Sequence, residues 1–284
     1  MKFIDWHAGF VAAMKLDLIE NEKDLVYNDE QTVANRAQRL DLLIIKNENG
    51  AKIINPIGAM FGKYNICEYK NPKEVLNYEA FFKTLAYTCL YLYESRQAHY
   101  TVADYTMTFV REPYPRELFK QLQLDGISIT PVIPGIYNIK NNLPFRTQVI
   151  VTKEISNEYG AWLRCLTKHG TEDNLENIIK KTPTLVGHNK DNADVVMNIF
   201  TASNRGLIDR KMKEDPDMCE AVNELFADQI KEKDIIITNL QNKLHSLEIE
   251  NSATINALKA EHDELLSIIA DLQAKLAQKS SDPI

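Results

Sequence analysis

The chain has 284 residues, of which 44% are apolar and 26% charged, with ten glycines and ten prolines. This is the composition of a folded globular protein, and it excludes collagen-like, low-complexity and wholly disordered chains. No apolar run approaches the ~20 residues of a membrane-spanning helix, and we expect no secretory signal because the first residues lack its small-residue cleavage pattern.

The net charge of −7 is distributed unevenly. Residues 219–284 carry six Lys or Arg and twelve Asp or Glu, whereas residues 1–218 carry 27 and 28. The body is therefore almost neutral, which argues against a wholly basic nucleic-acid-binding surface but allows a local basic groove. Four scattered cysteines form no CxxC pair, so we expect no cysteine zinc site, no disulfide framework and a reducing, cytoplasmic location.

The first 125 residues alternate between helix and strand patterns. An apolar helix is expected over roughly 6–19, and strand-type runs follow at 25–27, 39–45, 51–54 and 64–70. Asn47-Glu-Asn-Gly50 is typical of a hairpin turn between the second and third runs. A helix over 78–95, a strand over 105–110 and a helix beginning near Pro115 follow. This order predicts an α/β fold with a mixed sheet.

Two further segments follow this core. Residues 126–218 read as an accessory α+β segment packed on the core, with alternating strand-type runs over 128–154 and broken helices after 158. Residues 219–284 read as one long helix with a short tail, because 228–278 contain neither Gly nor Pro. We therefore expect three regions: 1–125, 126–218 and 219–284.

The C-terminal helix is predicted to form a coiled coil. Leucine and isoleucine recur at alternating steps of three and four residues in two seams, Ile237–Leu247 and Ile255–Leu276, with a four-residue stutter between them. His262 occupies one position of the second seam. A long helix with one apolar stripe needs a partner, so we expect a homo-oligomer. The alternative is a helix that folds back onto the body.

Three charged residues interrupt strands that should be buried: Asp41, Glu68 and Lys70. A carboxylate inside a sheet is costly unless it is paired or bound to a metal. Side chains alternate along a strand, so Glu68 and Lys70 share one face, and Asp41 can meet them from a neighbouring strand. Two carboxylates suit Mg²⁺ or Mn²⁺, and the lysine can stabilise a metal-bound hydroxide or the charge at phosphorus. This set therefore points to metal-assisted phosphodiester hydrolysis.

Structural roles are open for the same residues. Glu68 and Lys70 can form an ion pair at a strand edge without a metal, and Asp41 can be a buried acid paired with Arg36 or Arg39. These alternatives need no catalytic chemistry.

The order of Asp41 and Glu68-x-Lys70 on two strands that follow a helix and a strand resembles the PD-(D/E)XK nuclease superfamily. Within it, the pattern is similar to recombination-promoting or transposase-like nucleases and to RecB-type nucleases. The resemblance spans about residues 5–112 and implies a restriction-endonuclease-like core. It also implies that Asp41 and Glu68 bind the metal while Lys70 assists the attacking water.

The resemblance suggests three further residues. RecB-like members carry Gln-x-x-x-Tyr on the helix after the motif, and this chain has Lys83-Thr-Leu-Ala-Tyr87, so Lys83 and Tyr87 are candidate substrate contacts. Many members also have an acidic residue on the first helix or strand. Glu20 and Glu30 are the candidates, and Glu30 is favoured as a third metal ligand.

Two functions are therefore expected. The first is a Mg²⁺-dependent DNA endonuclease or transposase-like nuclease, in which the coiled coil brings two active sites together. The alternative is a catalytically inactive nuclease-fold protein that acts in interactions and oligomerises through its coiled coil. A regulatory coiled-coil protein with no nuclease ancestry is a third, weaker possibility.

Overall fold

The computed structural model describes residues 4–33, 38–47, 52–95, 101–140, 142–214 and 216–280. The chain divides into two compact units, Met1–Val222 and Asn223–Ile284. The first unit is a mixed α/β body, and the second consists of most of the long helix α8 (Pro216–Ser280). No helix in the described part of the chain is both long and apolar enough to cross a membrane.

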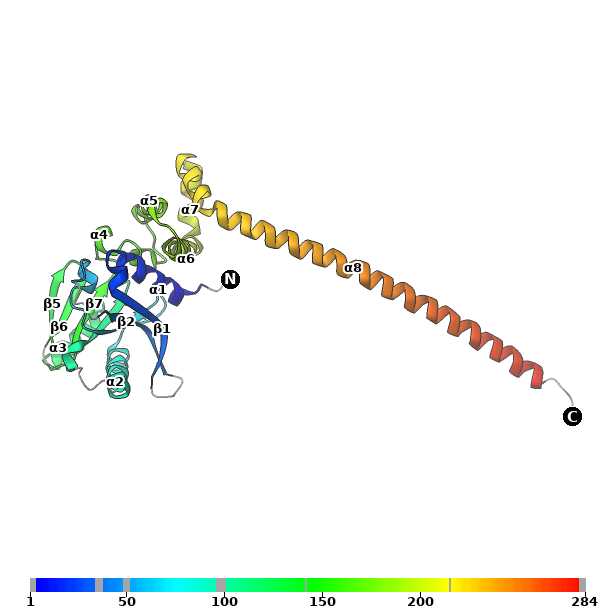
Figure 1. The fold of residues 1–284 in the computed structure, drawn as a ribbon, viewed down its shortest axis with the longest axis horizontal. Coiled ribbons are helices and arrows are strands. Elements are labelled where there is room, and N and C mark those ends of the chain that lie inside the picture. The colour runs from blue at the N-terminus through cyan, green and yellow to red at the C-terminus, as the bar shows by residue number, and fades with distance from the viewer. Residues whose placement is uncertain are drawn as a thin grey trace. The chain divides into compact units, whose positions relative to one another are not determined.

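The body is built on one seven-stranded mixed sheet in the order β1-β2-β3-β4-β7-β6-β5 (Figure 1). Its strands are β1 (Leu25–Val33), β2 (Gln38–Lys46), β3 (Tyr64–Lys70), β4 (Tyr105–Arg111), β5 (Ser128–Ile133), β6 (Ile136–Lys140) and β7 (Arg146–Val151). The neighbours β3, β4 and β7 are parallel, whereas β1, β2 and β3 at one end and β7, β6 and β5 at the other form antiparallel pairs. Parallel neighbours need a crossover connection, and α2 (Tyr78–Ser95) supplies it between β3 and β4.

Helices cover both faces of the sheet (Figure 1). On one face lie α2 and α3 (Arg116–Leu124), whose apolar side chains pack against the sheet. On the other lies α1 (Trp6–Asp17), where Phe10 stacks on Tyr69 of β3 with ring centroids 4.9 Å apart. The remaining helices are α4 (Asn157–Gly160), α5 (Glu172–Lys181), α6 (His188–Ser203) and α7 (Arg205–Glu214), and α6 packs on α1. Short 3₁₀ turns occupy Ile19–Asp24, Pro56–Gly58, Val102–Asp104, Leu163–Cys165 and Thr182–Thr184.

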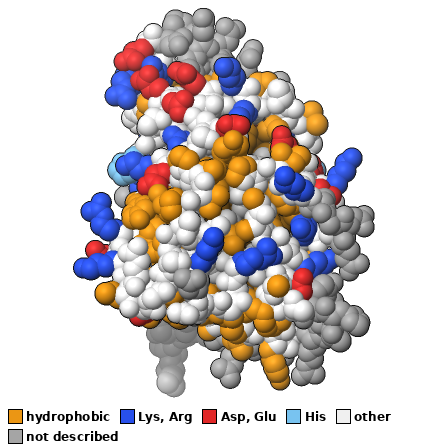
Figure 2. Space-filling model, turned by 90° about the vertical axis from the view of Figure 1, so that its left-hand side faces the viewer, with side chains coloured by type: hydrophobic (Ala, Val, Ile, Leu, Met, Phe, Trp, Pro, Cys, Tyr) orange, Lys and Arg blue, Asp and Glu red, His pale blue; other side chains and the backbone are white. Residues whose placement is uncertain are grey.

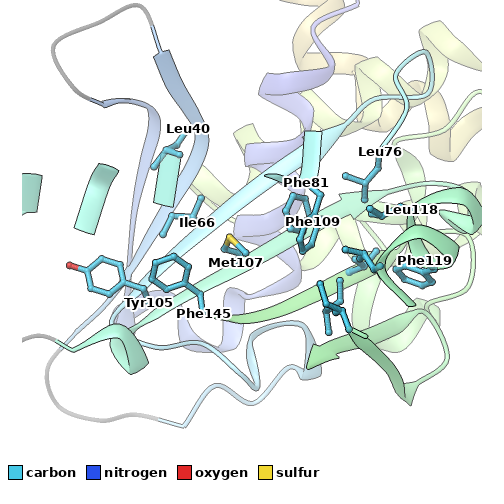
Figure 3. Close-up of a cluster of buried hydrophobic side chains, with 14 of the residues drawn as sticks. Leu40, Ile66, Leu76, Phe81, Tyr105, Met107, Phe109, Leu118, Phe119 and Phe145 are labelled. Atoms are coloured by element: carbon cyan, nitrogen blue, oxygen red, sulfur yellow. The ribbon is translucent and has the colours of Figure 1, made fainter. Parts of the chain in front are cut away.

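The core under α2 and α3 is rich in aromatic side chains. Phe81 of α2 stacks on Phe109 of β4 with ring centroids 5.0 Å apart, and both side chains are fully buried. The cluster runs along the sheet from Tyr105 and Phe145 to Phe119 (Figure 3). Burial of this apolar surface is the main force that fixes the central strands in register.

The expected hairpin after β2 is wrong. Lys52–Ile54 form no strand, and β2 pairs with β3 instead. The side chain of Asn21 accepts the backbone N–H of Ile54 and donates to the carbonyl of Lys52, so it takes the contacts that a neighbouring strand would have supplied. Most of the expected turn, 48–50, lies outside the described residues. The expected 78–95 helix is confirmed without change.

The segment after residue 125 continues the sheet of the first 125 residues. Strand β7 pairs in parallel with β4, and β6 and β5 extend the sheet from there. The expected division at 125/126 therefore does not coincide with a division in the fold. Parallel pairing between strands about 40 residues apart leaves no local sequence signal, because its contacts are all long-range.

Segment 156–165 is tied to α1 by a buried carboxylate. Asp17, at the end of α1, accepts the backbone N–H groups of Trp162 (3.1 Å) and Leu163 (2.9 Å), one on each oxygen. Burial raises the pKa of Asp17 to about 7, against the opposing effect of those two hydrogen bonds and of Lys181. Both oxygens have partners, so this group acts as a structural anchor.

Candidate functional site

The register of β2 and β3 brings two of the predicted site residues together. The antiparallel pairs run from Ile45↔Tyr64 to Leu42↔Cys67, so the next positions along the two strands are Asp41 and Glu68. Glu68 and Lys70 alternate with Tyr69 and lie on the face that α2 covers, in line with the buried Ile66. Glu68 and Lys70 therefore form the polar end of a row of β3 side chains that is otherwise apolar, and Asp41 lies beside Glu68 on β2.

Hydrogen bonds hold the three side chains in place. The Nζ of Lys70 donates to Oε1 of Glu68 at 2.6 Å, and only 16% and 9% of these side chains are exposed. Oδ2 of Asp41 accepts the backbone N–H of Tyr69 at 2.8 Å, at the point where the regular β2–β3 ladder ends. These contacts use one oxygen of each carboxylate, and the second oxygen of Asp41 and of Glu68 takes no part in them.

Two carboxylates and one ammonium group determine the electrostatics of the site. Burial, and then the nearby charge of Glu68, raise the pKa of Asp41 to about 6, while the Tyr69 N–H, Lys70 and His7 act in the opposite direction. Burial disfavours the ammonium of Lys70, but the charge of Glu68 and its hydrogen bond outweigh this and raise the pKa of Lys70. Lys70 therefore stays charged, and Asp41 and Glu68 repel each other. A cation between them would relieve that repulsion.

The donor set fits a hard divalent ion in type. Carboxylate oxygens are the ligands that Mg²⁺ and Mn²⁺ prefer, and Mg²⁺ usually keeps several waters and needs only one or two carboxylates from the protein. Within the described residues there is no cluster of three or more His, Cys, Asp or Glu side chains placed to hold a metal ion. Asp41 and Glu68 would therefore bind an ion together with water.

Glu30, the expected third metal ligand, lies on β1, the strand that pairs with the Asp41 strand β2. Glu30 lies opposite Asp41 between the pairs Asp29↔Leu42 and Gln31↔Leu40, at an irregularity in the ladder where its φ is +47°. Its carboxylate forms an ion pair with Arg39, and 52% of the Glu30 side chain is exposed. Arg39 is therefore the partner of Glu30, and no ion pair between Arg39 and Asp41, the alternative considered above, is found among the described residues. The alternative partner, Arg36, lies outside the described residues.

Lys83 and Tyr87 contact each other on α2. The Nζ of Lys83 lies 5.3 Å from the centroid of the Tyr87 ring, as expected for residues one helical turn apart. Tyr87 packs partly into the core, whereas Lys83 is exposed. In the described structure, no hydrogen bond or ion pair joins either side chain to Asp41, Glu68 or Lys70.

No family model matches this chain, and the curated proteins and solved structures give no significant match.

Two residues near the site, His7 and Arg111, were assigned no role from the sequence. Nε2 of His7, on α1, lies 2.6 Å from Oδ1 of Asp29, and His7 is close enough to affect the pKa of Asp41. Arg111 is paired with Lys70 in the register of the parallel strands β3 and β4. The alternation of Tyr105, Met107, Phe109 and Arg111 was visible in the sequence. The pairing of β4 with β3, which places Arg111 beside Lys70, was not visible in the sequence.

A pocket of about 350 Å³ is lined by Glu20, one of the two acidic candidates, but lies apart from the other predicted site residues. It is lined by Asp17, Trp162 and Lys181, among others, and by none of Asp41, Glu68 and Lys70. Because both oxygens of Asp17 are bound by backbone N–H groups, the pocket offers no free buried carboxylate from this residue.

Proposed function

We propose that the protein is a metal-dependent phosphodiesterase, a DNA endonuclease or transposase-like nuclease of the PD-(D/E)XK type. The observation that carries this proposal is the meeting of Asp41, Glu68 and Lys70 at one end of β2 and β3, partly shielded from water. A pair of adjacent carboxylates in such a place is unfavourable unless a cation compensates it.

The arrangement of the surrounding elements supports the proposal. Helix α1, the antiparallel strands β1, β2 and β3, helix α2 and the parallel strand β4 follow in the order that a restriction-endonuclease-like core requires. In this order the aspartate lies on the second strand and the Glu-x-Lys motif on the third, as the sequence resemblance implies. Function resides in the site and not in the fold, so the proposal rests on Asp41, Glu68 and Lys70.

The roles follow from the contacts. Asp41 and Glu68 would hold Mg²⁺ or Mn²⁺ through their remaining oxygens. A divalent ion there would supply a Lewis acid and a water of lowered pKa for attack on phosphorus. Lys70, held by Glu68, would stabilise the negative charge that develops at the phosphoryl group.

The distribution of surface charge restricts any contact with nucleic acid to a local site. On the face seen in Figure 2, lysine and arginine side chains are spread among apolar and uncharged ones and do not form one continuous basic patch. This agrees with the near-neutral body. DNA would therefore be held near the carboxylates by a few cations, and the binding would weaken with salt.

Nicking of a supercoiled plasmid tests the proposal. Wild-type protein should nick it only when Mg²⁺ or Mn²⁺ is present, and Asp41→Ala should abolish nicking with the fold intact. The matched control is Asp209→Ala, which removes an exposed carboxylate on α7 and should cut like wild type. Cutting by Asp41→Ala at the wild-type rate would refute the assignment.

We also propose that α8 joins copies of the chain, which is the basis of the alternative, non-catalytic function. Its seam residues are about half exposed, between 47% and 61%: Ile237, Leu240, Leu244, Leu247, Ile255, Leu258, Leu265, Ile269 and Leu272. Such a regular apolar stripe is typical of a coiled coil, and a second copy of the helix presents a matching stripe.

Analytical ultracentrifugation tests the second proposal. Leu258→Lys with Leu265→Lys places charges in the seam and should convert the oligomer to a monomer. Ser267→Lys adds a charge outside the seam and should leave the oligomer unchanged. If the wild-type chain sediments as a monomer at micromolar concentration, α8 does not join copies of the chain.

A further inference from the structure

The carboxyl ends of the parallel strands β3 and β4 bring two cations side by side. Lys70 and Arg111 are register partners, the last pair of a parallel ladder that begins at Tyr64↔Tyr105. Register partners on neighbouring strands lie about 5 Å apart and point to the same face of the sheet. Both residues therefore extend the row that contains the buried Met107 and Phe109, on the face covered by α2 and α3.

Arg111 has an unmet capacity for hydrogen bonding. Its Nε is buried and has no hydrogen-bond partner, and no carboxylate forms an ion pair with its guanidinium in the described part of the chain. Burial lowers the pKa of Arg111, and the neighbouring Glu112 only partly opposes this. The carboxylate of Glu112 is itself bound by the hydroxyl of Thr167. A buried donor without a partner costs free energy, so an arginine in this position needs an acceptor.

Lys70 and Arg111 differ in how their charges are compensated. Lys70 is partly neutralised by Glu68, but nothing described neutralises Arg111 in the same way. An anion between the two would compensate the charge of Arg111 and accept hydrogen bonds from its guanidinium. Arginine presents donors in a planar fork that matches the oxygens of a phosphate, and ligands of α/β sheets commonly bind outside the carboxyl ends of parallel strands.

We infer that Lys70 and Arg111 form a phosphate-binding subsite beside Asp41 and Glu68, in which Arg111 binds the non-bridging oxygens of one phosphodiester group of a nucleic acid. This inference rests on the proposed function and adds to it a residue that positions the substrate backbone. Arg111 binds through the phosphate alone, so the subsite contributes affinity without base specificity.

Binding of a fluorescein-labelled DNA duplex in EDTA, followed by anisotropy over a range of salt concentrations, tests the subsite without hydrolysis. Arg111→Gln should weaken binding about tenfold and should reduce the slope of log K against log salt by about one, as loss of one phosphate contact requires. Arg205→Gln is the matched control, because Arg205 is an exposed arginine on α7, and it should bind like wild type.

Arg111→Lys is the second variant, in case Arg111→Gln loosens the fold. Lysine keeps the charge but not the fork, so the salt slope should be retained and the affinity should fall about threefold. Wild-type affinity in Arg111→Lys or in a folded Arg111→Gln would overturn the inference, and so would failure of the wild-type chain to bind the duplex. Loss of binding in the Arg111 variants together with nicking by Asp41→Ala would instead contradict only the proposed function.

Discussion

Two aspartates of this protein have raised pKa values, Asp17 buried and Asp41 partly buried, but their surroundings differ. Asp17 has both oxygens bound by backbone N–H groups from one segment, whereas Asp41 accepts one backbone N–H and lies opposite a second carboxylate. Burial is the largest cause of the raised pKa in both cases. A raised pKa therefore does not by itself mark a functional group, and the like-charged neighbour of Asp41 is the informative feature.

The largest expected effect is on the rate of catalysis at the site that contains Asp41. Lys70→Met should lower the rate of plasmid nicking by about 10²–10³-fold, because it removes the cation that stabilises developing charge while leaving both carboxylates. Single-turnover nicking measures the rate, and Mn²⁺ affinity serves as the control, which should not fall. A nicking rate within a few-fold of wild type would show that Lys70 is only a partner of Glu68.

The next effect belongs to Asp17 and to stability. Asp17→Ala should lower the free energy of unfolding by about 2–4 kcal/mol, because it leaves two buried backbone N–H groups without partners. Urea denaturation measures this change, and nicking below the melting temperature should be retained. If Asp17→Ala is as stable as wild type, Asp17 is not a structural anchor, and the contrast between the two aspartates does not hold.

The pH dependence of stability sharpens the same contrast. The folded-state pKa of Asp17, about 7, is above its ordinary value of 3.8, so the folded protein holds this proton more tightly than the unfolded chain does. The contribution of Asp17 to the free energy of unfolding should therefore fall as the pH rises from about 4 to about 7 and should be constant above that. Relative to Asp17→Asn, wild type should lose about 2–3 kcal/mol between pH 5 and pH 8. A constant difference between the two proteins, measured by urea denaturation at both pH values, would contradict this.

The smallest effect is expected at Glu30, which the sequence favoured as a metal ligand. Its ion pair with Arg39 is more than half exposed. Glu30→Gln should therefore change the free energy of unfolding by less than about 0.5 kcal/mol and should leave Mn²⁺ affinity unchanged. A large loss of Mn²⁺ affinity in this variant would show that Glu30 is a metal ligand.

The sequence predicted the parts of the fold that depend on local pattern. Alternating apolar residues located β3 and β4, and the 78–95 helix was correct at both ends. Lys52–Ile54 do not form the expected strand, because the side chain of Asn21, some 30 residues earlier, forms hydrogen bonds with the backbone of Lys52 and Ile54. Tertiary contacts of this kind override local propensity.

For the candidate site, the residue types could be predicted but not all their neighbours. Charged residues in apolar strands pointed to Asp41, Glu68 and Lys70, and the structure brings them together. Arg111 could not be assigned, because its place beside Lys70 depends on the parallel register of β3 and β4. Glu30 forms an ion pair with Arg39 in the structure, and its role as a metal ligand stays a prediction.

The most direct test of the account is the binding of Mn²⁺, followed by the electron paramagnetic resonance signal of the free ion. Wild type and Asp17→Asn should each bind Mn²⁺ at one site per chain, and Asp41→Asn and Glu68→Gln should lose it. Equal binding of Mn²⁺ by Asp41→Asn and wild type, or no binding by wild type at millimolar Mn²⁺, would contradict the proposed metal site.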